Sequence, residues 1–312
     1  MTSVVEVENL RKNYNEKVAI NGMSFEVKKG EILGLLGPNG AGKSTMINIL
    51  ATVLSPTSGN VKMFGRDLKK GAKHVKQGIG IVPQDLAIFE EISAEKNVRF
   101  FAGLYNLKGN VLDKRVEEAL KLVRLYERKD DKPKTFSGGM KRRLNIACGI
   151  AHRPELVIMD EPSVGIDPQS RNHILESIKT LKNNGATIIY STHYMEEAEA
   201  ISDRIMIMNE GQIIAQGTKE DLHQKVKNQT AYAFQLTQSE RVNVGLIYQI
   251  EGVKSVQMTE DTFEITVDQS NDHVGDIIAA LTKEGCQIIN MASKKASLET
   301  VFLELTGRSL RD

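Results

Sequence analysis

Over the first two thirds of the chain, apolar residues follow two different spacings. Short apolar runs and alternation with a period of two predict β-strands, whereas apolar residues that recur every three or four positions predict helices. Strands are predicted over residues 4–7, 23–27, 31–36, 61–64, 78–82, 156–159, 186–191, 205–209 and 212–216. Helices are predicted over residues 44–50, 94–105, 114–125, 140–151, 172–183 and 195–201. Strands that alternate with helices favour an α/β core with a mainly parallel sheet, and the first strands form an antiparallel β part.

Two stretches depart from this alternation. Residues from about 85 to 150 are almost entirely helical in pattern, which indicates a helical subdomain inserted between strands. Near the C-terminus, strands are predicted over residues 231–236, 253–258, 263–267 and 286–291, helices over 241–249 and 273–283, and a last helix over 297–305. Strand, helix, two strands, helix and strand is the ferredoxin-like order. We therefore expect a larger domain over residues 1–220 and a small α+β domain over residues 221–312.

Composition and charge restrict the class of protein. The chain has 312 residues, of which 40% are hydrophobic, and a formal net charge of +1, which gives no electrostatic case for a nucleic-acid partner. Cys148 and Cys286 lie in apolar-patterned segments and are predicted to be buried structural thiols, which fits a reducing compartment. The N-terminus lacks a signal layout, and no apolar run approaches the ~20 residues that cross a bilayer. We therefore expect a cytoplasmic protein whose role at a membrane would require a partner.

A nine-residue glycine-rich motif joins the predicted strand 31–36 to the predicted helix 44–50. It fits G-x-x-x-x-G-K-[ST] and consists of Gly37, Pro38, Asn39, Gly40, Ala41, Gly42, Lys43, Ser44 and Thr45. In this pattern the glycines let backbone N–H groups approach a polyphosphate, and the positive end of the helix faces it. Lys43 would contact the β- and γ-phosphates, and Ser44 would ligate Mg²⁺. A turn with a chance lysine is the alternative, but strand, loop and helix together predict a P-loop NTPase core that binds a nucleoside triphosphate.

Two adjacent carboxylates, Asp160 and Glu161, end the apolar strand 156–159. A buried strand needs no acids, so their position at its tip suggests chemistry. Asp160 would hold Mg²⁺ directly or through water, and Glu161 would polarise the water that attacks the γ-phosphate. The alternative is that both acids cap the following turn.

A third motif, Ser137-Gly138-Gly139, opens a predicted helix about twenty residues before the carboxylates. Small residues at a helix N-terminus expose backbone amides and a hydroxyl, which suits a phosphate. The chain already has a phosphate loop, so a second phosphate site makes sense if it serves the nucleotide of another subunit.

Together, the three motifs resemble those of the ATPase subunit of ABC transporters, over about residues 4 to 220. The resemblance implies that Tyr14 stacks on adenine, that Gln84 senses Mg²⁺ and water, that Asp167 lies in a loop crossing a dimer interface, and that His193 contacts the γ-phosphate. For Tyr14 and His193, a purely structural role is the alternative. Met140 and Phe136 stand where the family commonly has glutamine and leucine, so the rate and coupling of hydrolysis could differ from the family's. Ile166 also replaces a usual leucine, a harmless exchange.

The resemblance also implies a mechanism and partners. Two ATPase subunits, identical or paralogous, would bind each ATP between the phosphate loop of one and Ser137–Gly139 of the other, and hydrolysis by Glu161 would reopen the pair. An integral membrane permease would dock between residue 84 and about residue 105, where Leu86, Ile88, Phe89, Phe100 and Phe101 offer apolar surface. For Phe100 and Phe101, packing within the helical subdomain is the alternative.

The C-terminal region refines the branch of the family. Its ferredoxin-like pattern and the segment from Ser297 to Gly307 are similar to the ending of bacterial ATPases that energise drug, antibiotic, lipid or sodium export through a separate permease. This resemblance implies an exporter subunit, attached to the inner face of the cell membrane through the permease, whose last domain is regulatory or dimerising. A non-transport ATPase that acts on ribosomes or DNA and an importer ATPase are the alternatives.

Overall fold

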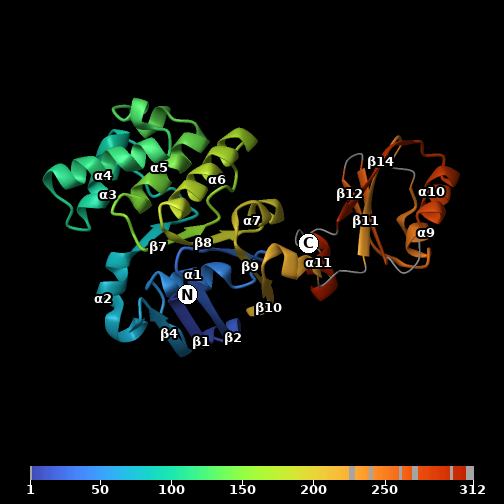
Figure 1. Ribbon diagram of the computed structural model, residues 1–312, viewed down its shortest axis with the longest axis horizontal. Coiled ribbons are helices and arrows are strands. Elements are labelled where there is room, and N and C mark those ends of the chain that lie inside the picture. The colour runs from blue at the N-terminus through green and yellow to red at the C-terminus, as the bar shows by residue number, and fades with distance from the viewer. Residues whose placement is uncertain are drawn as a thin grey trace. The chain divides into compact units, whose positions relative to one another are not determined.

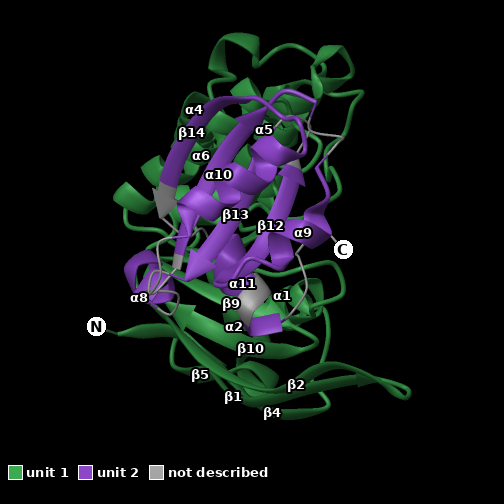
Figure 2. Cartoon of the chain, turned by 90° about the vertical axis from the view of Figure 1, so that its right-hand side faces the viewer, with its two compact units in different colours: residues 1–218 green, residues 219–312 purple. Residues whose placement is uncertain are grey.

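The computed structural model describes residues 2–224, 229–238, 242–259, 262–268, 273–295 and 298–306. The chain divides into two compact units, residues 1–218 and residues 219–312 (Figure 2). Within the described ranges, no helix is both long enough and apolar enough to pass through a membrane.

The first sheet of unit 1 is antiparallel, with strand order β2-β1-β4-β5. Its strands are β1 (Ser3–Tyr14), β2 (Lys17–Lys28), β4 (Ser58–Met63) and β5 (Arg66–Asp67). The predicted antiparallel part is confirmed, but β1 and β2 are much longer than the alternation of residues 4–7 and 23–27 predicts. The additional residues include the turn-proximal pairs Asn13 with Val18 and Tyr14 with Lys17, where side chains are exposed and the apolar alternation therefore ends.

The second sheet of unit 1 has strand order β10-β9-β3-β8-β7-β6 and is parallel except for the β9–β10 pair. Its strands are β3 (Ile32–Leu36), β6 (Ile79–Val82), β7 (Leu156–Asp160), β8 (Thr187–Thr192), β9 (Arg204–Asn209) and β10 (Gln212–Gly217). Every residue of β3 and β8 is buried, as expected for parallel strands covered on both faces. Parallel strands end at one edge of the sheet, so the segments after β3, β7 and β8 come together there.

Helices cover this sheet and form the block between β6 and β7 (Figure 1). The block contains α3 (Ala94–Gly103), α4 (Gly109–Leu122) and α5 (Gly138–Ile150), so the predicted helical subdomain is confirmed. The remaining helices of unit 1 are α1 (Lys43–Leu50), α2 (Leu68–Gly78), α6 (Pro168–Asn183) and α7 (Met195–Ile201).

Two of these helices differ from the prediction. The helix α2 was not predicted, because Leu68 and Val75 alone are buried in it and its other positions are polar or small. The helix α6 begins four residues before the predicted start at Asn172, because Asp167 is its N-cap and Pro168 occupies the first turn. An aspartate followed by a proline is a signal for the start of a helix, whereas the sequence analysis placed Asp167 in a loop.

Unit 2 has the predicted ferredoxin-like order, and its sheet β12-β13-β11-β14 is antiparallel throughout. Its elements are α8 (Lys219–Gln224), β11 (Gln229–Leu236), α9 (Val244–Tyr248), β12 (Val253–Thr259), β13 (Thr262–Asp268), α10 (Val274–Lys283), β14 (Ile288–Lys295) and α11 (Leu298–Thr306). Its core includes Phe234, Phe263 and Ile265 from the sheet and Ile277 and Leu281 from α10.

Three predictions in unit 2 need correction or fall outside the described residues. The last strand begins at Ile288, so Cys286 belongs to the preceding loop rather than to the strand. The helix α9 is shorter than the predicted range 241–249. Ser297 and Gly307, the ends of the C-terminal motif, lie outside the described residues. Both cysteines are buried and free, as predicted, and burial raises the pKa of the Cys148 thiol well above its usual range.

Candidate functional site

The glycine-rich loop leaves the buried end of β3 and enters α1 at Lys43. The side chain of Lys43 is only 4% exposed, and its Nζ donates to the carbonyl oxygens of Gly37 (2.7 Å) and Pro38 (3.1 Å). The loop therefore wraps the lysine ammonium with its own backbone. A buried ammonium beside the positive end of a helix makes a strongly anion-attracting site.

Gly42 shows why this loop needs a glycine at the start of α1. Its φ is 100°, in the left-handed region, and a Cβ there would lie 2.5 Å from the carbonyl oxygen of Ala19 in β2. The constraint at Gly42 comes from the neighbouring strand, whereas the sequence argument attributed it to the approach of a phosphate. Strand β2 thereby lies against the phosphate loop.

The two predicted carboxylates stand at the end of β7, facing the loop. Glu161 is 6% exposed, and its Oε1 lies 3.3 Å from Lys43 Nζ. Its φ is 46°, a left-handed conformation that non-glycine residues adopt at a cost and that clusters at functional sites. Asp160 Oδ1 accepts from the Ser191 hydroxyl at 2.9 Å. Burial raises the pKa of Asp160, opposed by hydrogen bonds from Ser191 and Ser44.

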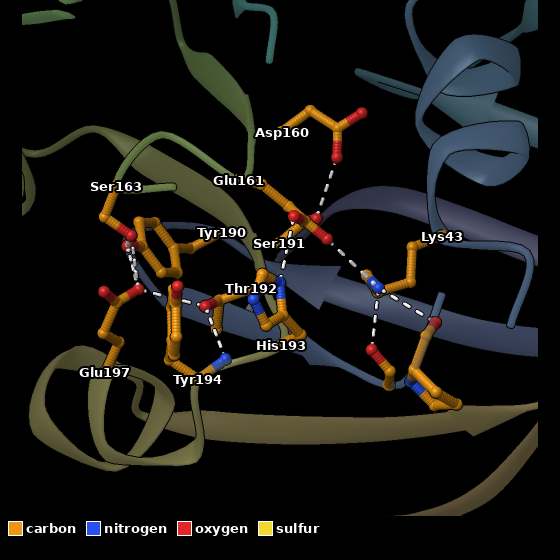
Figure 3. Close-up of polar contacts among 12 residues, drawn as sticks. Lys43, Asp160, Glu161, Ser163, Tyr190, Ser191, Thr192, His193, Tyr194 and Glu197 are labelled. Carbon is orange, nitrogen blue, oxygen red and sulfur yellow. Dashed lines mark hydrogen bonds and ion pairs between the residues drawn. The ribbon is translucent and has the colours of Figure 1, made fainter. Parts of the chain in front are cut away.

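His193 follows the neighbouring strand β8 and completes this arrangement (Figure 3). Its Nδ1 lies 3.0 Å from Glu161 Oε2, and the backbone N–H of Glu161 donates to the Ser191 carbonyl oxygen at 3.1 Å. Lys43 and His193 thus hold the two oxygens of the Glu161 carboxylate. The structure brings together Lys43, Ser44, Asp160, Glu161 and His193, which the sequence analysis had selected from three separate segments.

A buried network behind His193 was not found by the sequence analysis. Glu197 of α7 is 2% exposed, and its Oε2 accepts from the hydroxyls of Ser163 (2.7 Å), Tyr190 (2.7 Å) and Thr192 (3.0 Å) (Figure 3). Its Oε1 lies 3.3 Å from Arg171 Nε of α6. Burial and this carboxylate raise the pKa of the Tyr190 phenol.

This network lies beside His193 and Glu161, on the side away from Lys43 (Figure 3). Ser163 follows Glu161 by two residues, and Thr192 immediately precedes His193. The Thr192 hydroxyl also accepts from the backbone N–H of Tyr194 at 2.9 Å, so the backbone is held on both sides of the histidine. The signal in the sequence was slight: one acid among several in a short helix.

The Ser137–Gly139 motif lies at the start of α5, and its described contacts are with α5 itself and α6. Ser137 is the N-cap, and its hydroxyl accepts from the Met140 backbone N–H at 3.3 Å. Gly139 packs so closely on Ser170 that a Cβ would overlap the Ser170 hydroxyl. Ser137 and Gly138 are exposed. The motif is therefore presented outward rather than toward the Lys43 loop of its own chain.

The other three predicted site residues lie around this centre. Asp167 caps α6 and accepts from the Ser170 backbone N–H at 2.9 Å, a bond that lowers the pKa of Asp167. Gln84 is exposed two residues beyond β6, and its carbonyl oxygen accepts from Arg142. Tyr14 ends β1, pairs with Lys17, and has an exposed ring with Lys12 Nζ 5.2 Å from its centroid.

The described residues contain no cluster of three or more His, Cys, Asp or Glu side chains that could bind a metal ion. Mg²⁺ does not require such a cluster, because it commonly uses one or two protein oxygens together with substrate phosphates. The Ser44 hydroxyl in the first turn of α1 and the Asp160 carboxylate at the end of β7, which interact with each other, supply such a pair of oxygens. The donor set therefore fits Mg²⁺.

Comparison with known sequences agrees with this geometry. The ABC transporter family model matches residues 20–164. The linearmycin resistance ATP-binding protein LnrL of Bacillus subtilis is 44% identical over 99% of this chain and 100% of that protein. The doxorubicin resistance ATP-binding protein DrrA of Mycobacterium tuberculosis is 33% identical over 97% of this chain and 93% of that protein.

Solved structures give the same assignment. An ATP-binding subunit of an ABC transporter matches with a TM-score of 0.66 and 32% identity, over 72% of this chain and 94% of that one. A dimeric ATP-binding cassette in a post-hydrolysis state with ADP and Pi matches with a TM-score of 0.63 and 26% identity, over 69% of this chain and 98% of that one. The chain belongs to the ABC transporter family, as an ATP-binding and ATP-hydrolysing subunit of the exporter type.

Proposed function

We propose that Glu161 is the general base of ATP hydrolysis and that this chain uses the reaction to power export through a separate membrane permease. The observation that carries the proposal is the position of the buried Glu161 carboxylate between Lys43 (3.3 Å) and His193 (3.0 Å). Lys43 binds the β- and γ-phosphates, His193 orients Glu161 and contacts the γ-phosphate, and Glu161 accepts a proton from the attacking water. Tyr14 stacks on the adenine, and Gln84 contacts Mg²⁺ and water.

Mg²⁺ bound by Ser44 and Asp160 would neutralise charge on the phosphate oxygens. The close contact of the Ser44 hydroxyl with Asp160 supports this assignment. The backbone N–H groups from Gly37 to Thr45 and the N-terminus of α1 hold the phosphates in place.

The functional unit is a head-to-tail pair of ATPase chains, with a second copy of this chain as the expected partner. Ser137 and Gly138 are exposed at a helix N-terminus and make no described contact with the Lys43 loop, which suits a role at the nucleotide of the other subunit. Asp167 lies beside this motif, because a Cβ on Gly139 would be 3.5 Å from Asp167 Oδ2 as well as in contact with Ser170. The similar dimeric structure with ADP and Pi supports the pairing.

The permease docks on an apolar patch of the helical subdomain formed by Leu86, Phe89 and Phe100. Phe89 and Phe100 are each 48% exposed, and their rings meet edge to face with centroids 5.2 Å apart. Ile88 and Phe101, which the sequence also suggested for this surface, pack against the subdomain core instead. Through this contact the chain is located at the cytoplasmic face of the membrane. The large exposed rings support docking, because single soluble domains rarely expose such clusters.

The cargo class follows from the relatives rather than from this chain. The relatives named above are resistance proteins for linearmycin and doxorubicin, which supports a drug- or antibiotic-type compound as cargo. In this arrangement the permease recognises the cargo. Unit 2 stabilises or regulates the ATPase pair.

Hydrolysis by purified Glu161→Gln protein tests the catalytic assignment. Turnover should fall by about 10²–10⁴-fold, while ATP binding persists and ATP drives formation of a dimer detectable by size-exclusion chromatography. Glu155→Gln is the matched control, since Glu155 is an exposed acid at the opposite end of β7. Unchanged turnover in Glu161→Gln would remove the assignment of the general base.

Co-purification from detergent-solubilised native membranes tests the transport assignment. The tagged chain should bring along a polytopic membrane protein, and Phe89→Ser with Phe100→Ser should lose it while retaining ATPase activity. Val111→Ser, at an exposed apolar position on α4, is the control and should retain the partner. Recovery of ribosomes or DNA-bound proteins instead would favour the non-transport alternative.

A further inference from the structure

Two neighbouring arginines of α5 each bind two backbone carbonyl oxygens, but in different parts of unit 1. Arg142 donates through Nη1 to Pro83 O (3.0 Å) and through Nη2 to Gln84 O (2.6 Å). Arg143 donates through Nη1 to Val123 O (3.0 Å) and Arg124 O (3.3 Å), at the C-terminal end of α4. Arg142 thus connects α5 to the segment after β6, whereas Arg143 connects two parts of the helical subdomain.

The Arg142 guanidinium is buried without a carboxylate in contact with it. The residue is 6% exposed, its Nε has no hydrogen-bond partner, and no ion pair to it occurs within the described ranges. Burial lowers the pKa of Arg142, with Asp85 opposing the shift. A buried charge that is satisfied only by carbonyl oxygens reduces stability compared with an apolar side chain. Such an arrangement indicates a function that requires these two hydrogen bonds.

Asn145, one turn further along α5, binds the same segment. Its Nδ2 donates to Pro83 O at 3.3 Å, and its Oδ1 accepts from the Ala87 backbone N–H at 3.1 Å. Asn145 is also buried. Four hydrogen bonds from one face of α5 therefore hold residues 83–87, the segment that carries Gln84.

The N-terminus of the same helix carries the Ser137–Gly139 motif. Arg142 lies five residues after the N-cap Ser137, about one and a half turns of a continuous helix. A helix of this length moves as a rigid body, so a displacement of its N-terminus is also a displacement of Arg142 and Asn145. The contacts then impose that displacement on the backbone of Gln84.

We propose that Arg142 is a positioning residue that couples the two nucleotide sites of the ATPase pair. Contact of Ser137–Gly139 with the nucleotide of the other subunit moves α5, and Arg142 transmits that movement to Gln84 in the subunit's own site. The proposal rests on the function proposed above, since it requires the head-to-tail pair. It assigns regulation of hydrolysis to a side chain that contacts neither nucleotide nor metal.

Arg142→Met and Arg143→Met form a matched pair for the test, because each removes from α5 a guanidinium that donates to two backbone carbonyl oxygens, although Arg143 is only partly buried. Full-length variants are compared by thermal unfolding, ATP affinity, kcat, the Hill coefficient for ATP and the Mg²⁺ concentration for half-maximal rate. Thermal unfolding shows whether either variant is still folded, so that a loss of coupling is distinguished from a loss of stability. Arg142→Met alone should lower kcat at least about tenfold, bring the Hill coefficient toward one and raise the Mg²⁺ requirement, with ATP affinity retained.

A second set of variants keeps the test open if Arg142→Met does not fold. Asn145→Leu removes two of the four hydrogen bonds at similar volume and should change kcat and the Hill coefficient in the same direction. Arg142→Lys keeps the charge and one donor and should recover part of the loss. In the double variant Ser137→Ala with Arg142→Met, kcat should fall no further than in the more impaired single variant, because both changes interrupt one connection.

The outcomes separate this inference from the proposed function. Equal kcat, Hill coefficient and Mg²⁺ requirement in Arg142→Met and Arg143→Met would overturn the positioning role while leaving the ATPase assignment intact. Multiplicative losses in the double variant would also overturn it. A wild-type chain with no ATP hydrolysis at all would overturn both.

Discussion

His193 Nδ1 and Glu161 Oε2 lie 3.0 Å apart, although the two residues are separated by 32 positions in the sequence. Each follows a strand of the parallel sheet, and β7 and β8 are hydrogen-bonded neighbours, so the sheet itself brings the two side chains together. Glu161 is buried, whereas the His193 side chain remains 30% exposed. A partly exposed imidazole against a buried carboxylate is placed to reach a bound molecule as well as its partner.

Replacing His193 should therefore impair the chemical step more than binding. We expect His193→Ala to lower kcat about 10²-fold, with ATP affinity changed only a few-fold because the loop around Lys43 is intact. His193→Gln should retain part of the activity, since its amide can still donate to Glu161. Steady-state kinetics and nucleotide titration measure the two effects. His74→Ala, an exposed histidine on α2, is the control, and a His193→Ala protein with wild-type kcat would leave the contact structural.

Glu197→Gln should destabilise the protein although the two side chains have nearly the same shape. The amide oxygen of the glutamine can still accept from the hydroxyls of Ser163, Tyr190 and Thr192. Its NH₂ group would then face Arg171, and both groups are hydrogen-bond donors. Loss of a buried pair of this kind costs about 2–4 kcal/mol, whereas Glu196→Gln, one position earlier and exposed, should change stability by less than about 0.5 kcal/mol. Urea unfolding of both variants tests this, and equal midpoints would contradict it.

Most of the candidate site could be predicted because its motifs are local. The residues Gly37 to Thr45 specify the turn after β3 and the start of α1 within nine positions, and Asp160 and Glu161 end an apolar run. Glu197 could not be predicted, because the hydroxyl of Ser163 that it binds lies 34 positions away. Arg142 binds a carbonyl 58 positions away. Such partners depend on which strands are neighbours and on how α5 and α7 pack, and a periodic pattern in one segment contains neither.

Gly139 illustrates a second limit of motif analysis. The sequence suggests that small residues at 138 and 139 serve a phosphate, but the structure shows that Gly139 also accommodates Ser170, whereas Gly138 has no neighbour within 4 Å of a Cβ. Gly139→Ala should therefore destabilise the isolated chain by about 1–3 kcal/mol, and Gly138→Ala should not. Chemical unfolding in the absence of nucleotide measures this. Ser170→Gly should restore part of the stability of Gly139→Ala, and no restoration would contradict the packing argument.

His152 provides a pH-dependent contribution to stability away from the nucleotide site. Its ring stacks on Tyr105 with centroids 3.5 Å apart, and its Nε2 donates to the Ile79 carbonyl oxygen at 3.0 Å. Its Nδ1, where a second proton would bind, is buried without a partner. Burial lowers the pKa of His152 to about 4, only partly opposed by the Ile79 carbonyl.

The folded protein therefore keeps His152 neutral at pH values where the unfolded chain protonates it. Because the folded pKa is the lower of the two, stability is unaffected above about pH 6.5, falls as the pH drops from there to about 4, and levels off below that. The loss amounts to at most about 3 kcal/mol. In His152→Phe the stack on Tyr105 is retained but the titration is removed, so the difference in unfolding free energy between this variant and wild type should move in favour of the variant between pH 7 and pH 4. Urea unfolding at several pH values measures this difference, and parallel profiles for the two proteins would show that His152 is protonated equally in the folded and unfolded states.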